Sequence, residues 1–236
     1  MSAFVIEPRY CGPPASGNGG YVCGRLSAFL PGSARVRLRV PPPLGTRLAV
    51  RPAAAGVELL HGDTVVAEAR LQALELDVPG APDFAAAEAA ARDYRGFRSH
   101  PFPTCFVCGP ARGPGDGLRI FPGPLDPAGP VAAPWIPDAS LADGRVEVRP
   151  EFLWAALDCP GAFALDIPEG APVLLGELSA VIRGTVAAGE RCIVLGWNLG
   201  RDGRKHFAGT ALYAESGECR AFARATWFEM PAGGTR

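Results

Sequence analysis

The sequence predicts an α+β fold made of two similar halves, in which each half is one helix followed by antiparallel strands. Three observations predict this fold: an internal repeat, period-two alternation in the strand segments, and an apolar stripe on each helical segment. The chain has 236 residues, which is enough for two compact units of ~100 residues each.

Residues 36–71 and 180–225 carry the same succession of short strand-like segments separated by turns. The two copies differ most in length at one place. Gly45 and Gly56 are 11 positions apart in the first copy, whereas Gly189 and Gly209 are 20 positions apart in the second, so the second copy is nine residues longer there. A long internal repeat indicates two copies of one supersecondary unit.

The first half opens with a loop-like stretch, residues 1–15, followed by a predicted helix over residues 16–30. Ser16 or Asn18 supplies the N-cap, and a Pro-Gly pair ends the helix. The apolar stripe of this helix consists of Tyr21, Val22, Leu26, Phe29 and Leu30.

Strands follow this helix. In residues 36–40 aliphatic side chains alternate with arginines, and in residues 67–73 alanine and leucine alternate with charged or amide side chains. A period of two predicts strands with one buried face and one solvated face.

Residues 79–147 differ in composition, being rich in proline and glycine, with a short predicted helix at 85–94. Proline removes a backbone donor and fixes φ, which suits a connection. The segment is too apolar for a free linker. It is therefore predicted to pack on the surface between an N-terminal unit, 1–78, and a C-terminal unit, 148–236.

The second predicted helix covers residues 151–165, with Pro150 in its first turn. Pro160 and Gly161 are predicted to kink or end it. Its apolar stripe consists of Phe152, Leu153, Ala156 and Leu157. Antiparallel strands are predicted over residues 173–228.

The formal net charge is −1, which gives no electrostatic support for nucleic-acid binding. No apolar run reaches the ~20 residues of a membrane span. The N-terminus has no secretory signal pattern, so the expected location is the cytoplasm. The seven cysteines are accordingly expected to be reduced thiols.

Three short motifs resemble those of a known family. They are the run Phe-Leu-Trp-Ala-Ala-Leu-Asp at 152–158, the Gly turn and alternating alanines at 217–225, and the helix entry Asn-Gly-Gly-Tyr at 18–21. The chain resembles the double hotdog acyl-CoA thioesterases of the thioesterase II type, over both halves but not over residues 77–147. The resemblance implies two antiparallel sheets, each wrapping a central helix, which join edge to edge in one chain.

The thioesterase II type pairs its helix Asp with a Gln on the closing strand and a hydroxyl residue on a neighbouring strand. This chain departs from that pattern, because its second half contains no Gln and the Gln position aligns with Ala225 or Thr226. Thr226 or Thr210 is the expected substitute for orienting the water.

Asp158 lies on an otherwise apolar helical face. Burial raises the pKa of a carboxyl group, which makes Asp158 a candidate general base for activating water at a thioester. The alternative is a structural carboxylate that accepts hydrogen bonds from loop amides near Pro160 and Gly161.

Asn18, Gly20 and Tyr21 stand at the start of the first predicted helix. Free N–H groups there can form an oxyanion hole, and Asn18 would orient the carbonyl group or the water. The wider hotdog superfamily is similar at this helix entry, where N–H groups face the thioester carbonyl. The alternative is a common helix cap. Pairing of the two halves would bring these residues and Asp158 to one ligand.

His100, Cys105 and Cys108 have the spacing of metal ligands. A closed zinc site needs a fourth ligand. The candidates for it are Cys11, Cys23, Cys159 and His61. Packed thiols are the favoured alternative. No metal is therefore predicted, and no cofactor is expected beyond coenzyme A as part of the substrate.

Arg201, Arg204 and Lys205 cluster in the part of the second copy that the first copy lacks. Arginine binds phosphate through two parallel hydrogen bonds, so the cluster is a candidate site for the phosphates of coenzyme A. The alternative is a solvated hairpin tip, which the flanking glycines favour.

The predicted function is hydrolysis of an acyl thioester such as acyl-CoA. Asp158 would activate the water, and N–H groups at Gly20 and Tyr21 would hold the carbonyl oxygen. The first alternative is a non-catalytic acyl-CoA or lipid-binding protein. The second is a hydratase or dehydratase, which the small number of histidines, three, disfavours. The expected partner is a small-molecule acyl-CoA or acyl thioester, and assembly into a homo-oligomer of double hotdogs is left open.

Overall fold

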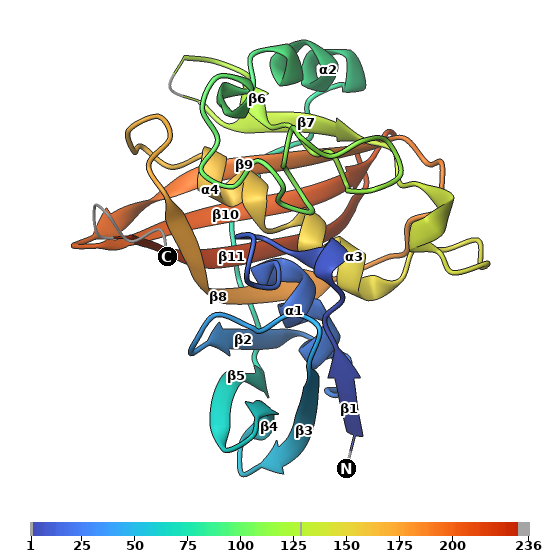
Figure 1. Ribbon diagram of the computed structural model, residues 1–236. Helices are drawn as coiled ribbons and strands as arrows, with labels where there is room; N and C mark the ends of the chain where they lie inside the picture. Colours follow the sequence, from blue (N-terminus) through green and yellow to red (C-terminus); the bar gives the residue numbers. More distant parts are fainter. Residues whose placement is uncertain (1, 128, 231–236) are drawn as a thin grey trace.

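The strands form one antiparallel sheet. The computed structural model describes residues 2–127 and 129–230, and in this part of the chain eleven strands are hydrogen-bonded in the order β1-β3-β4-β5-β2-β8-β11-β10-β9-β7-β6 (Figure 1). The strands are β1 (Ser2–Val5), β2 (Ala34–Leu38), β3 (Arg47–Ala53), β4 (Gly56–His61), β5 (Thr64–Leu71), β6 (Gly123–Pro124), β7 (Val131–Trp135), β8 (Val173–Ile182), β9 (Cys192–Asp202), β10 (Lys205–Ala214) and β11 (Cys219–Glu229).

The two halves of the sheet meet at β2 and β8. These strands pair from Ala34↔Ala180 to Arg37↔Glu177. Outward from β2 the neighbouring strands are β5, β4, β3 and β1, and outward from β8 they are β11, β10, β9, β7 and β6. The strands β2 to β5 and β8 to β11 are therefore arranged in the same way in the two halves. The prediction of an α+β chain with antiparallel strands is confirmed. The two predicted sheets are joined edge to edge at β2 and β8, so the described strands form a single hydrogen-bonded sheet.

The helices lie on both faces of this sheet. They are α1 (Gly19–Ser27), α2 (Phe84–Arg92), α3 (Pro150–Ala156) and α4 (Cys159–Phe163), with 3-10 turns at Pro8–Tyr10, Arg95–Phe97 and Ala139–Leu141. Helix α1 packs against α3, β2 and β8, while α4 packs against β9 and β10 (Figure 1). Phe84 of α2 packs with Trp197 and Tyr213 in a separate apolar cluster on the other face. No helix in the described residues is long and apolar enough to cross a membrane.

Both predicted main helices are shorter in the structure. Helix α1 begins at Gly19 because Asn18 caps it, while Ser16 forms a β-bridge with Pro43. The second predicted helix is divided into α3 and α4, and Asp158 lies in the break with φ −84° and ψ −83°. Pro160 explains the break, since a proline ring cannot be accommodated in a continuous helix and provides no N–H.

Three strands were not predicted. Strand β1 lies in the stretch expected to be a loop, where four residues are too few to show a period. Strands β6 and β7 belong to the connection, and β7 pairs with β9 from Val131↔Gly196 to Trp135↔Cys192. The connection was expected to pack on the surface, but the side chains of Phe106 and Val107 are 0% exposed. Part of this segment therefore belongs to the core.

Candidate functional site

The site centres on Asp158, in the break between α3 and α4, where its carboxylate faces the start of α1. Asn18 Nδ2 donates a hydrogen bond to Asp158 Oδ2 at 2.7 Å, and the Gly20 N–H donates to the same oxygen at 2.9 Å. The structure thus brings a carboxylate from the second half of the chain to the helix start of the first half.

Glycine makes this approach possible. A Cβ atom at Gly20 would lie 2.6 Å from Asp158 Cβ and 2.7 Å from the Trp154 carbonyl oxygen, so no larger residue fits without movement. The Tyr21 N–H donates to Asn18 Oδ1 at 2.9 Å, which fixes the amide so that its NH2 group points to Asp158. The helix cap therefore also positions the carboxylate.

Burial dominates the electrostatics of Asp158. The residue is 2% exposed, and burial raises the pKa of its carboxyl group to about 7, although the hydrogen bonds from Gly20 and Asn18 favour the charged form. The second oxygen, Oδ1, is buried and has no hydrogen-bond partner among the described residues. A carboxyl group that titrates near neutrality is suited to proton transfer.

The expected oxyanion hole differs from what is found. The N–H of Gly20 donates to Asp158 and the N–H of Tyr21 donates to Asn18, so both groups are engaged within the protein. Asn18 Nδ2 carries a second hydrogen, and Cys105 Sγ lies 3.9 Å from this nitrogen. This contact is long for a hydrogen bond, so it engages the second hydrogen of the amide only weakly.

The two threonines lie in different places. Thr210 Oγ1 donates to the Leu157 carbonyl at 2.8 Å, so its hydroxyl holds the backbone immediately before Asp158. Thr226 pairs with Glu177 across β11 and β8, and directly opposed residues share a face of the sheet. That face carries the Arg35–Glu177 ion pair. The structure therefore does not bring Thr226 to Asp158.

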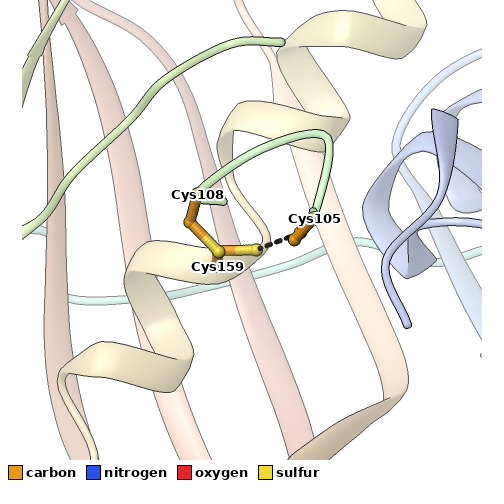
Figure 2. Close-up of side chains that lie close together, drawn as sticks. All are labelled: Cys105, Cys108 and Cys159. Carbon is orange, nitrogen blue, oxygen red and sulfur yellow. Dashed lines mark hydrogen bonds between the residues drawn. The ribbon is translucent and has the colours of Figure 1, made fainter. Parts of the chain in front are cut away.

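Three buried thiols lie beside this carboxylate. The Sγ atoms of Cys105, Cys108 and Cys159 are all within 4.8 Å of one another, and those of Cys105 and Cys159 are 3.7 Å apart (Figure 2). Hydrogen bonds from the Cys108 and Cys159 thiols lower the pKa of Cys105. From the sequence, Cys159 is one of four candidates for a further metal ligand beside Cys105 and Cys108. The sequence alone does not show which of these distant residues lies near that pair. His61, another candidate, lies on the exposed end of β4.

A pocket of about 70 Å³ adjoins the thiols, and His100 lies at its wall. Its apolar lining includes Phe102, Phe163, Ile167, Val173 and Trp227. A larger hollow of about 400 Å³ is lined by residues of β2 to β5, including Arg37, Arg39 and Glu68. Neither cavity is lined by Asp158 itself. The smaller one is nearer to the site, because its wall includes Cys159, which follows Asp158 in the chain, and Cys105, whose Sγ lies 3.9 Å from Asn18 Nδ2.

The three candidate phosphate-binding residues, Arg201, Arg204 and Lys205, lie at the tip of the β9–β10 hairpin. Arg201 and Lys205 are exposed, and Arg204 Nη2 donates to the Glu229 carbonyl at 3.2 Å. His206, next in the chain, is buried, and its Nε2 lies 2.5 Å from Glu229 Oε1. The end of β11 thus fixes one side of the hairpin tip.

The comparison with protein-family models found no match, and the comparison with curated protein sequences found none either. Three solved structures are similar over nearly the whole chain. The tesB protein of Mycobacterium avium subspecies paratuberculosis is 14% identical, with a TM-score of 0.59, covering 97% of this chain and 92% of that one. A candidate thioesterase from Novosphingobium aromaticivorans is 14% identical, with a TM-score of 0.60 and coverage of 97% and 95%. A candidate thioesterase II from Thermobifida fusca is 15% identical, with a TM-score of 0.58 and coverage of 97% and 92%. These similarities show that the chain has the fold of thioesterase II-like proteins.

Proposed function

We propose that the protein hydrolyses an acyl thioester, with Asp158 as the general base that activates water. The observation that carries the proposal is a buried carboxylate with one oxygen held by Asn18 and Gly20 and the other, Oδ1, without a partner among the described residues. The fold shared with thioesterase II-like proteins supports it. We also infer that each half of the sheet, with its helix, is one hotdog unit.

In the proposed reaction, Asp158 Oδ1 accepts a proton from water while the water oxygen attacks the thioester carbonyl carbon. The carbon–sulfur bond then breaks, and the proton passes to the leaving thiolate, giving a carboxylic acid and a thiol. The second hydrogen of Asn18 Nδ2 is the donor for the carbonyl oxygen, because the N–H groups of Gly20 and Tyr21 already hold the carboxylate and the amide. Thr210 keeps Asp158 in place through the Leu157 carbonyl.

The substrate is proposed to be an acyl-CoA with its acyl group in the apolar pocket beside Cys159. Trp227 lines that pocket and pairs with His206 across β11 and β10. The neighbouring Arg204 and Lys205, with Arg201, therefore stand at the same end of the sheet, where they would bind the phosphates of coenzyme A.

The arginine assignment has its own test. Replacing Arg204 with Ala should raise KM for acyl-CoA about tenfold and leave kcat unchanged, because a hydrogen bond to a charged group is lost far from the reacting carbon. Arg92→Ala, which removes an exposed arginine on α2, is the matched control. An unchanged KM for Arg204→Ala would remove the hairpin from the proposed site.

Non-catalytic binding of acyl-CoA is the second candidate, favoured by the engagement of both expected oxyanion donors. The deciding experiment follows thiol release from short, long and aromatic acyl-CoAs, with thermal unfolding measured on the same compounds. Turnover supports the hydrolase. Stabilisation by an acyl-CoA without any thiol release would contradict it and establish the binding protein, because a ligand that binds only the folded state raises Tm.

A further inference from the structure

The thiol cluster joins two distant parts of the chain. Cys105 and Cys108 belong to the connection between the halves, and Cys159 is the first residue of α4 (Figure 2). All three side chains are buried, with exposed fractions of 4%, 2% and 7%. They line the proposed acyl pocket, but no step of the proposed hydrolysis uses a thiol group, so the close approach of three thiols needs a separate account.

The separations of the sulfur atoms match those of a metal centre. Zinc bound tetrahedrally, with zinc–sulfur bonds of about 2.3 Å, places its thiolate sulfurs about 3.8 Å apart. The Sγ atoms of Cys105 and Cys159 are 3.7 Å apart, and all three sulfurs lie within 4.8 Å of one another. One ion can therefore contact all three after only small side-chain movements.

We propose that Cys105, Cys108 and Cys159 bind one zinc ion through three thiolates. The pocket adjoins all three cysteines, so it provides room for a water molecule as the fourth ligand. Thiolate ligands select zinc over magnesium or calcium, which bind oxygen. The ion also compensates the cost of burying the thiolate charges.

His100 contacts one of the proposed ligands but does not itself bind the ion. The Phe102 N–H donates to His100 Nδ1 at 2.9 Å, so Nδ1 is the acceptor and carries no proton. The ring proton is therefore on Nε2, which lies 3.3 Å from Cys108 Sγ. A protonated nitrogen donates a hydrogen bond and cannot coordinate, so His100 orients the Cys108 thiolate instead of binding the ion.

The surrounding chain explains what the metal would stabilise. Residues 98–122 contain no helix or strand, yet the stretch 105–108 is buried, which is unusual for irregular backbone. Gly109 closes the turn after Cys108, since a Cβ atom there would lie 2.5 Å from the backbone nitrogen and oxygen of Cys105. A shared ion would tie this turn to the start of α4, and metal binding would contribute to folding.

The first test uses the whole wild-type chain, purified under reducing conditions and supplied with zinc. We expect one zinc per chain by elemental analysis, and replacement by Co²⁺ should give the near-ultraviolet absorption of cobalt bound to thiolates. No retained metal would overturn the proposal. A disulfide between two of these cysteines in reduced buffer, detected by mass spectrometry, would overturn it as well.

The second test assigns the ligands. Cys108→Ala and Cys159→Ala should each lose stoichiometric metal, whereas Cys192→Ala, which removes a buried thiol on β9 outside the cluster, should retain it. His100→Ala should still bind one ion with ~10–100-fold lower affinity, as expected for a lost outer partner. Equal metal content in all three cysteine variants would contradict the assignment. Complete loss in His100→Ala would contradict the outer role of the histidine.

Discussion

At the scale of single residues, Asp158 is positioned by contacts from two elements, α1 and β10. Asn18 and Gly20 at the start of α1 hold its Oδ2, and Thr210 on β10 holds the carbonyl immediately before it. A lone carboxylate on an apolar helix and a Gly-rich helix start are visible in the sequence, so both were predicted. The bond of Thr210 to Leu157 was not, because it joins residues 53 positions apart on different elements.

The Thr210 hydroxyl gives a prediction at this scale. Thr210→Val should lower the free energy of unfolding by about 1–3 kcal/mol, because the buried Leu157 carbonyl loses its donor. Thr210→Ser keeps the hydroxyl and should be less destabilised. Urea unfolding of the three proteins measures the difference. If the valine variant proved as stable as wild type, the hydroxyl would have no part in holding the break before Asp158.

At the scale of elements, the contact between α1 and α3 depends on two glycines one helical turn apart. Gly20 meets Asp158 and Trp154, and a Cβ atom at Gly24 would lie 2.6 Å from Glu151 Cα and 2.8 Å from Trp154 Cβ. Small residues on one helix face let the two helices approach closely, and this approach sets the position of the site. The sequence showed the glycines but not which helix they would contact.

Substituting Gly24 tests that packing. Gly24→Ala should destabilise the protein by about 1–3 kcal/mol, since a methyl group placed against backbone atoms overpacks the contact. Gly80→Ala is the control, because a Cβ atom there meets nothing within 4 Å. Thermal or urea unfolding gives the comparison. Equal stability of the two variants would show that α1 and α3 tolerate a wider separation.

At the scale of the whole molecule, the site exists only because the two halves pair. Asn18 and Gly20 come from one half and Asp158 from the other, and the β2–β8 contact joins the halves in one sheet. The internal repeat predicted two similar units. It did not predict β6 and β7 or the buried turn at 105–108, because these belong to the connection, which has no counterpart in the repeat. A Pro-rich composition indicates irregular backbone but does not distinguish a surface path from a buried one.

The central claim is that Asp158 activates water, and the turnover number of Asp158→Asn tests it most directly. The amide has nearly the shape of the carboxylate but cannot accept the proton, so kcat on the best acyl-CoA should fall ~10²–10⁴-fold. Asp166→Asn, at an exposed position after α4, is the matched control and should keep wild-type turnover. If Asp158→Asn also kept wild-type kcat, Asp158 would not be the base, and the carboxylate would be a structural link between the two halves.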